Sequence, residues 1–229
     1  MPGKIISIEG GDGSGKETQT RILFERLNRE GYTCEKMSFP RYNTPTGRII
    51  GQCYLGKKDL GEGDVAWFGD PTKVNPRIAS SYYAIDRLAA LPEIEEIIDS
   101  GKHLILDRWI ESNMAHQASK EIGFPKRSEI KNFIHTLEYD TFKLPKPDIT
   151  IFLDIPFNVA RELAERRGIE LDGHESDLEY LKNTNKVFKE LSKVYSWEKI
   201  ECTPNGTIDS LRNPEDIGEE VYQKVEERI

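Results

Sequence analysis

Short apolar runs alternate along this chain with longer stretches in which apolar residues recur at helical spacing. This alternation is typical of βαβ units, in which helices connect parallel strands. The expected strands are KIISIE, TCEKMSF, HLILD, PKPDITIFLDI and WEKIEC, at residues 4–9, 33–39, 103–107, 145–155 and 197–202. The pattern therefore predicts an α/β fold with a doubly wound, parallel sheet.

Helical spacing fills the intervals between these runs. Asn75-Pro76 is a helix start signal, and Pro156 falls in the first turn of another helix, where its missing N–H costs nothing. Pro92 lies inside a predicted helix, so we expect a kink or a break there. The expected helices span residues 18–30, 76–100, 156–167, 177–195 and 214–229.

The length of 229 residues favours one sizeable domain, residues 1–229, over two small ones. Hydrophobic residues make up 37% and charged residues 31%, as in ordinary soluble enzymes. The apolar runs reach only strand length, and the start MPGKIISIEG lacks the basic and apolar stretches of a secretion signal. We therefore expect a cytoplasmic protein.

The formal net charge of −8 argues against a nucleic-acid polymer or an acidic membrane as the main partner, because both require a basic face. Any anion site must therefore be local. The cysteines, Cys34, Cys53 and Cys202, are far apart, so we expect buried thiols rather than disulfides or a metal site. The histidines show no zinc-ligand spacing.

The segment IEGGDGSGKETQT, starting at Ile8, follows a predicted strand and opens a predicted helix. It matches the phosphate-binding pattern G-x-x-x-x-G-K-[ST] except at Glu17, which replaces the hydroxyl residue. Glycines let backbone N–H groups converge on phosphate oxygens, and Lys16 can reach the β and γ phosphates. The predicted ATP-binding residues are Gly10, Gly11, Asp12, Gly13, Ser14, Gly15, Lys16, Glu17 and Thr18.

Two predicted strands end in an aspartate that could bind magnesium, namely Asp107 and Asp154. Asp107 is the better candidate, because the next residue, Arg108, could bind a second phosphate. For Asp154 a cap on the following helix is a sufficient explanation.

The guanine-reading motif N-K-x-D is missing, which makes a GTPase unlikely. The remaining interpretation is a small phosphotransferase that gathers arginines around an acceptor phosphate, since such transfer depends on positioning and charge neutralisation. The available arginines are Arg41, Arg87, Arg108, Arg161, Arg166 and Arg167.

Several motifs occur together and in order over nearly the whole chain: GGDGSGK, FPRY from Phe39, YAIDR from Tyr83, DRWIESN from Asp107, LPKPD from Leu144, and arginines before HESDLEYL. In these motifs the chain resembles thymidylate kinases. The resemblance implies a P-loop NTPase fold, with a five-stranded parallel sheet flanked by helices on both faces and a short lid at about 166–176. It also implies transfer of the ATP γ-phosphoryl group to thymidine monophosphate with Mg²⁺, and a homodimer.

The resemblance also implies how the acceptor is held. Asp12 would bind the 3′-hydroxyl of the sugar, Arg41 and Arg108 would bind the phosphate, and Asp107 would serve both magnesium and the acceptor phosphate. Lys16, Asp107 and Arg108 are therefore expected to be catalytic.

For the base, the resemblance implies a separate group of residues. Tyr83 stands where the family usually stacks a Phe on thymine, and Arg87, one helical turn later, would bind the carbonyl edge. Asn113 and Gln117 would complete the base and sugar contacts, and Phe39 belongs to the same site.

The chain departs from the family pattern at the lid and loop. Gly13 stands where some members place a catalytic arginine, and Gly173 stands where members with lid arginines often have another. Arg166 and Arg167 are then expected to supply the transition-state charge.

Two other functions remain open. Tyr83, and His116 where a Tyr is common, motivate a nucleoside monophosphate kinase with other or broader base and sugar choice. Glu17 and Gly173 motivate a nucleotide-binding regulator without catalysis. A regulator is opposed by six retained residues, because binding alone would not need two phosphate sites: Asp12, Lys16, Arg41, Arg87, Asp107 and Arg108.

Glu17 is expected in the first turn of the helix, where the dipole favours negative charge. Magnesium keeps several waters, so losing the hydroxyl ligand need not abolish its binding. Glu17 is then a water-mediated magnesium partner or a solvated side chain beside the site.

Overall fold

The computed structural model describes residues 2–57, 68–166 and 177–229. Its sheet has five strands in the order β2-β3-β1-β4-β5, and every neighbouring pair is parallel. This confirms the predicted sheet. The strands are β1 Ile5–Glu9, β2 Cys34–Ser38, β3 His103–Asp107, β4 Ile149–Asp154 and β5 Glu198–Glu201.

All five predicted helices are present, together with elements that were not predicted. The longer helices are α1 Lys16–Arg29, α3 Pro76–Asp99, α4 Ile110–Ala118, α5 Phe124–His135, α6 Phe157–Arg166, α7 Leu178–Val194 and α8 Pro214–Glu226. The short ones are α2 Pro45–Arg48, the π-helices η1 Ile49–Tyr54 and η3 Thr136–Thr141, and the 3₁₀ turn η4 Ile208–Ser210.

The structure corrects two expectations that involve prolines. A kink or a break was expected at Pro92, and the break does not occur, because helix α3 continues through this residue. Pro92 is exposed, which allows water to satisfy the carbonyl that lacks a donor. Strand β4 begins at Ile149 rather than at Pro145, because Pro145 and Pro147 carry no N–H for a sheet ladder.

Helix α4 was not predicted because it has no polar face. Nearly all its residues are buried, including the polar Glu111, Ser112, Asn113 and Gln117. The apolar and polar positions therefore do not separate at helical spacing, and the pattern on which helix prediction depends is absent.

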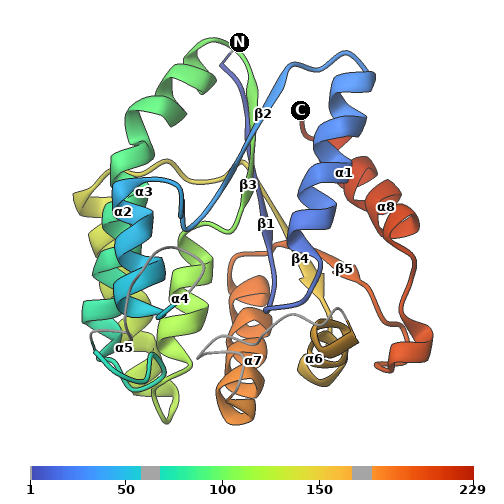
Figure 1. Ribbon diagram of the computed structural model, residues 1–229. Helices are drawn as coiled ribbons and strands as arrows, with labels where there is room; N and C mark the ends of the chain where they lie inside the picture. The colour runs from blue at the N-terminus through green and yellow to red at the C-terminus, as the bar shows by residue number, and fades with distance from the viewer. Residues whose placement is uncertain (1, 58–67, 167–176) are drawn as a thin grey trace.

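The sheet separates two apolar layers. Leu104, Leu106 and Phe152 pack on one face with residues of α3, α4, α5 and α7, whereas Ile105 and Ile151 pack on the other with α1, α6 and α8. Figure 1 shows α1 and α8 on one side of the sheet and α3, α4 and α5 on the other. Helices therefore cover both faces, as predicted.

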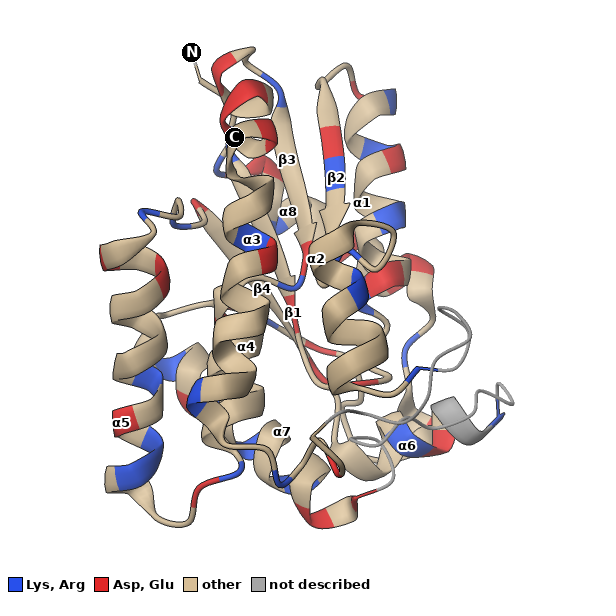
Figure 2. Ribbon diagram, turned by 60° about the vertical axis from the view of Figure 1, so that its left-hand side comes forward, with Lys and Arg blue, Asp and Glu red and all other residues tan. Residues whose placement is uncertain are grey.

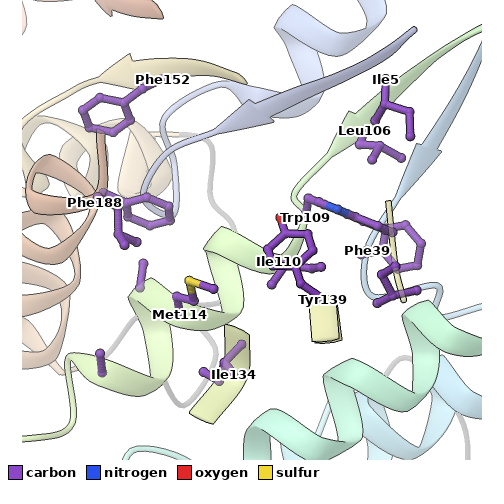
Figure 3. Close-up of a cluster of buried hydrophobic side chains, with 14 of the residues drawn as sticks. Ile5, Phe39, Leu106, Trp109, Ile110, Met114, Ile134, Tyr139, Phe152 and Phe188 are labelled. Atoms are coloured by element: carbon purple, nitrogen blue, oxygen red, sulfur yellow. The ribbon is translucent and has the colours of Figure 1, made fainter. Parts of the chain in front are cut away.

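The first layer reaches up to the carboxyl ends of the strands. There Phe39, after β2, packs edge-on against Trp109, with ring centroids 5.2 Å apart (Figure 3). Both rings are buried, and the Trp109 indole N–H donates to the carbonyl of Pro145 at 3.1 Å. The segments after β2 and β3 are thereby fixed next to each other.

The cysteines are buried free thiols, as expected. Basic and acidic positions are interspersed along α1 and α5 in the view of Figure 2. Within the described ranges, no helix is both long enough and apolar enough to cross a membrane.

The topology brings two loops together. Strands β1 and β3 are neighbours, and Ile8 lies opposite Asp107. The glycine loop after β1 and the Asp107-Arg108 pair after β3 therefore lie side by side at the carboxyl edge of the sheet. This is the edge at which open α/β sheets bind ligands.

Candidate active site

The glycine loop connects β1 to α1 and contains the predicted ATP-binding residues 10–18. Gly13 and Gly15 have φ angles of 74° and 84°, which favour glycine. A Cβ atom at Gly13 would lie 2.6 Å from the carbonyl oxygen of Ala160 in α6. The loop therefore has no room for a side chain at position 13, and a cation cannot come from there.

Lys16 is the first residue of α1 and is only 4% exposed. Its ammonium group donates to the carbonyl of Gly11 at 2.6 Å and lies 3.5 Å from the Ser14 hydroxyl. Burial, and then Arg108, lower the Lys16 pKa to about 8, although Asp12 and Asp107 oppose the shift. The ammonium group is thus held over the loop by neutral oxygens, and a phosphate would supply the missing countercharge.

Asp107 is buried at the end of β3, and no hydrogen bond reaches its Oδ1 atom within the described residues. It lines a cavity together with Glu17 and Thr18, from the first turn of α1. A buried carboxylate oxygen without a partner, beside a phosphate loop, fits Mg²⁺, which prefers hard oxygen ligands and one or two carboxylates plus phosphates.

Asp154, the other candidate, occupies a different environment. Its carboxylate lies 3.1 Å from the Lys189 ammonium of α7 and 3.0 Å from the Lys199 ammonium of β5. Two lysines therefore neutralise it, and Asp107 remains the residue that fits magnesium.

Arg108 follows β3 with a φ of 69°, an unusual conformation for a residue other than glycine. Its guanidinium forms an ion pair with Asp12, from the glycine loop. Burial is the largest single effect and would raise the Asp12 pKa, but Arg108, together with His116 and Lys16, lowers it overall, so Asp12 remains a carboxylate. The loop after β1 and the loop after β3 are therefore connected by this ion pair as well as by the pairing of their strands.

His116 extends this network. Its Nε2 atom lies 3.3 Å from Nη1 of Arg108, and its Nδ1 atom lies 2.8 Å from the Tyr180 hydroxyl. A guanidinium only donates, so Nε2 accepts the bond and the proton of the neutral ring is on Nδ1. His116 is thus oriented by Tyr180, from α7.

A cavity of about 240 Å³ opens beside Arg108. Of the residues predicted to hold the acceptor, all but Arg41 and Asp107 line it: Asp12, Phe39, Tyr83, Arg87, Arg108, Asn113, His116 and Gln117. The remaining lining residues, which were not predicted, are Ser38, Pro40, Tyr42, Leu55, Lys57 and Ser112. Lys57 adds a cation, 5.4 Å from the ring centroid of Tyr42, and no motif singled it out.

Arg41 has other contacts. Its guanidinium lies 3.1 Å from the Glu93 carboxylate and 3.9 Å from that of Asp86, and its backbone N–H donates to Asp86 at 2.8 Å. It is not among the residues lining the cavity, so its phosphate contact stays a prediction.

Arg87 lines the cavity and forms a buried ion pair with Glu138, of η3. Nε and Nη2 of Arg87 donate to the two carboxylate oxygens at 2.5 and 2.8 Å. Burial disfavours the charged form of Arg87, but Glu138 more than compensates and raises its pKa. Asn113 donates to the same carboxylate at 2.8 Å.

Some polar atoms around the cavity are unsatisfied. Within the described residues, Oδ1 of Asn113 and both amide atoms of Gln117 are buried without a hydrogen-bond partner. Buried polar groups are normally hydrogen-bonded. These atoms therefore point to a polar ligand in the cavity.

Glu9, at the end of β1, is a buried residue that the sequence analysis missed. It accepts hydrogen bonds from the Trp109 backbone N–H at 2.7 Å and from the Ser112 hydroxyl at 2.5 Å. Burial is the main effect on Glu9 and raises its pKa. Glu9 thereby ties β1 to the start of α4, which carries the acceptor residues.

Of the predicted lid, only the first residue belongs to the described part of the chain. Arg166 ends α6, its side chain is 62% exposed, and it pairs with Glu162 at 2.6 Å. Arg167, Gly173 and the rest of the lid, residues 167–176, lie outside the described residues.

Comparisons with known proteins agree with this geometry. Residues 8–209 match the family model of thymidylate kinase. The chain is 30% identical to a probable thymidylate kinase of Pyrobaculum aerophilum, over 96% of this chain and 95% of that protein. It is 26% identical to the thymidylate kinase of Schizosaccharomyces pombe, over 97% of this chain and 91% of that protein.

A solved structure gives the same fold. The thymidylate kinase of Candida albicans superimposes with a TM-score of 0.70 at 24% identity, over 99% of this chain and 92% of that one. The fold is therefore the P-loop NTPase fold.

Proposed function

The chain belongs to the thymidylate kinase family, and we propose that it transfers the γ-phosphoryl group of ATP to thymidine monophosphate. The observation that carries the proposal is the junction of the two sites. Asp12 and Arg108 form an ion pair and line the acceptor cavity, while Asp12 also belongs to the loop that holds Lys16. A donor phosphate at the loop and an acceptor phosphate at Arg108 would be neighbours.

On the donor side, the backbone N–H groups of the loop and the N-terminus of α1 bind phosphate oxygens. Lys16 holds the β and γ phosphates. Asp107 would hold Mg²⁺, with Glu17 as a partner through water, and the ion would supply positive charge to the phosphates.

On the acceptor side, Arg108 orients the acceptor phosphate, and Asp12 binds the 3′-hydroxyl of the sugar. Tyr83 packs on the base, and Arg87 and Asn113 read its edge. An acceptor phosphate oxygen attacks the γ-phosphorus in line while the bond to the β-phosphate oxygen breaks, with no covalent enzyme intermediate. Arg166 and Arg167 supply positive charge in the transition state.

A homodimer is part of the same proposal, and α3 offers the surface. Ile78 and Ile85, two helical turns apart, are each 46% exposed, and Ala89 continues the stripe one turn further on. An isologous contact between two α3 helices would bury these side chains. Light scattering checks this: Ile78→Asp with Ile85→Asp should give monomers, and a parent that is itself monomeric would refute it.

We also propose that residues 1–229 act as one catalytic unit in the cytoplasm, with small nucleotides rather than nucleic acids or membranes as partners. The net charge of −8 supports this choice.

An ATP-consumption assay over a panel of nucleoside monophosphates tests the function. Thymidine monophosphate should be the best acceptor. A preference for cytidine or adenosine monophosphate would indicate a kinase with another base choice. ATP binding without consumption on any acceptor would indicate a regulator.

A further inference from the structure

Glu138 is completely buried and does not line the acceptor cavity, yet it contacts two residues that do. It lies in η3, and its carboxylate accepts hydrogen bonds from Arg87, of α3, and from Asn113, of α4. A ligand in the cavity would touch Arg87 and Asn113 but not Glu138. Any influence of Glu138 on the ligand therefore passes through these two side chains.

The first consequence concerns Asn113. Its Nδ2 atom donates to Glu138 at 2.8 Å and to the backbone carbonyl of Ser80 at 3.1 Å. Both partners only accept, so both amide protons are used and the orientation of the amide is determined. The Oδ1 atom is left, buried and without a partner in the described structure. Asn113 therefore presents an acceptor to the cavity.

The second consequence concerns Arg87. The carboxylate of Glu138 engages Nε and Nη2 in a bidentate pair. The pair uses two of the five N–H groups of the guanidinium, and no hydrogen bond among the described residues uses Nη1. Arg87, which is 2% exposed and lines the cavity, therefore presents only donors to it.

A donor side chain beside an acceptor side chain matches a base edge in which a carbonyl lies next to an N–H. Thymine and uracil have this edge, with a carbonyl at C4 and a proton on N3. Cytosine has the reverse, an amino group at C4 and a bare N3. Both positions would be mismatched in this cavity, and buried mismatched polar groups are costly.

We propose that Glu138 is the positioning residue that determines base selectivity, because it fixes the donor of Arg87 and the acceptor of Asn113 toward the base. The inference rests on the proposed function. A purely structural role, in which Glu138 only neutralises the buried Arg87, makes a different prediction, namely equal losses on every base.

The parent enzyme gives the first test. Thymidine monophosphate and 5-methyl-deoxycytidine monophosphate share the methyl group, sugar and phosphate, and differ only at C4 and N3. We expect kcat/KM to differ by about 100-fold or more in favour of thymidine monophosphate. A ratio below about threefold, with good turnover of thymidine monophosphate, would overturn the inference but leave the proposed function standing. If no nucleoside monophosphate is phosphorylated, both fail, the inference falling with the function on which it rests.

Glu138→Gln gives the second test, because it keeps the shape of the side chain but can no longer accept at both oxygens. The ratio between the two substrates should fall about tenfold or more, mainly through KM for thymidine monophosphate, with KM for ATP unchanged. Glu111→Gln is the matched control. Glu111 is a buried carboxylate of α4 that accepts from the Tyr139 hydroxyl at 2.5 Å and does not line the cavity, so its variant should keep the ratio within about twofold.

Glu138→Asp completes the series, since it keeps the charge but shortens the reach, and it should restore part of the ratio. It also replaces Glu138→Gln if that variant does not fold. Equal losses of kcat/KM on both substrates in the Glu138 variants, leaving the ratio unchanged, would show a structural role only.

Discussion

The two ends of the active site handle charge differently. At the base end, Arg87 is paired with Glu138, and both are buried. At the donor end, Lys16 contacts a carbonyl and a hydroxyl, and Asp107 has a buried oxygen without a partner in the described residues. The base end is electrostatically complete before the substrate arrives, whereas the donor end is completed by the nucleotide.

This difference separates selectivity from catalysis. Because Arg87 and Glu138 are already paired and buried, the side chains need not rearrange when a base binds. Such a preorganised network can discriminate between bases. At the donor end, Lys16 has no carboxylate bound to it and Asp107 has an unpartnered oxygen in the described residues, so both can respond to phosphates and, in the proposed mechanism, to Mg²⁺.

The largest effect is expected at the lid. Changing both Arg166 and Arg167 to Ala should lower kcat by about 10³ to 10⁵, the value of an arginine that stabilises the transition state in phosphoryl transfer. Folding should be unaffected, because the Arg166 side chain is 62% exposed. Turnover within about tenfold of the parent, with ATP binding intact, would show that these residues are only a solvated helix end.

The second prediction compares two arginines that are both paired with a glutamate. Arg87→Met should lower the free energy of unfolding by about 3–5 kcal/mol, because it leaves Glu138 buried and unpaired. Arg166→Ala should change it by less than about 1 kcal/mol, because its pair with Glu162 is exposed. Urea unfolding of both variants measures the contrast, and similar losses would contradict it.

The contrast also explains what the sequence could predict. Strands and amphipathic helices were recognised because their apolar residues recur with the period of the element. Asp107 was recognised because it ends an apolar run, and topology placed it beside the loop. Helix α4 was missed because it is buried on all sides.

Glu138 shows the limit most clearly. It lies 51 residues from Arg87 in the sequence, in the π-helix η3, which was not predicted, so no local pattern connects the two. Glu9 was missed for the same reason, since its partner Trp109 is 100 residues away. Motif recognition found residues that line the acceptor cavity, whereas the buried residues that hold them in place required the structure.

At the donor end, Asp107→Ala should lower kcat by about 100-fold at saturating magnesium, since a carboxylate that holds the ion is lost. The requirement for magnesium should rise as well. Titration of magnesium at fixed ATP gives both values, with Asp154→Ala as the control, because its lysine partners assign it to an ion pair away from the loop. Indifference to Asp107→Ala would refute the magnesium assignment.

The fourth prediction uses the depressed pKa of Lys16, about 8 in the unligated protein. Phosphate binding requires the ammonium form, which is lost as the pH rises through 8. The Kd of a non-hydrolysable ATP analogue should therefore increase above pH 8, approaching about tenfold per pH unit. Lys16→Arg keeps its charge at every pH tested and should flatten this profile. A flat profile in the parent would show that Lys16 keeps an ordinary pKa.

The smallest effect is expected at Glu17, which is exposed in the first turn of α1. It lines a cavity together with Asp107, but Asp107 and the phosphates can hold magnesium without a direct contact from Glu17. Glu17→Ala should therefore change kcat by less than about threefold, far less than Asp107→Ala. The negative charge of Glu17 should still affect ATP affinity, because a carboxylate near the triphosphate repels it unless the cation lies between them. ATP binding should thus depend on magnesium more steeply in the parent than in Glu17→Ser. If Glu17→Ala and Asp107→Ala are equally damaging in the same titration, Glu17 is itself a direct ligand of the ion.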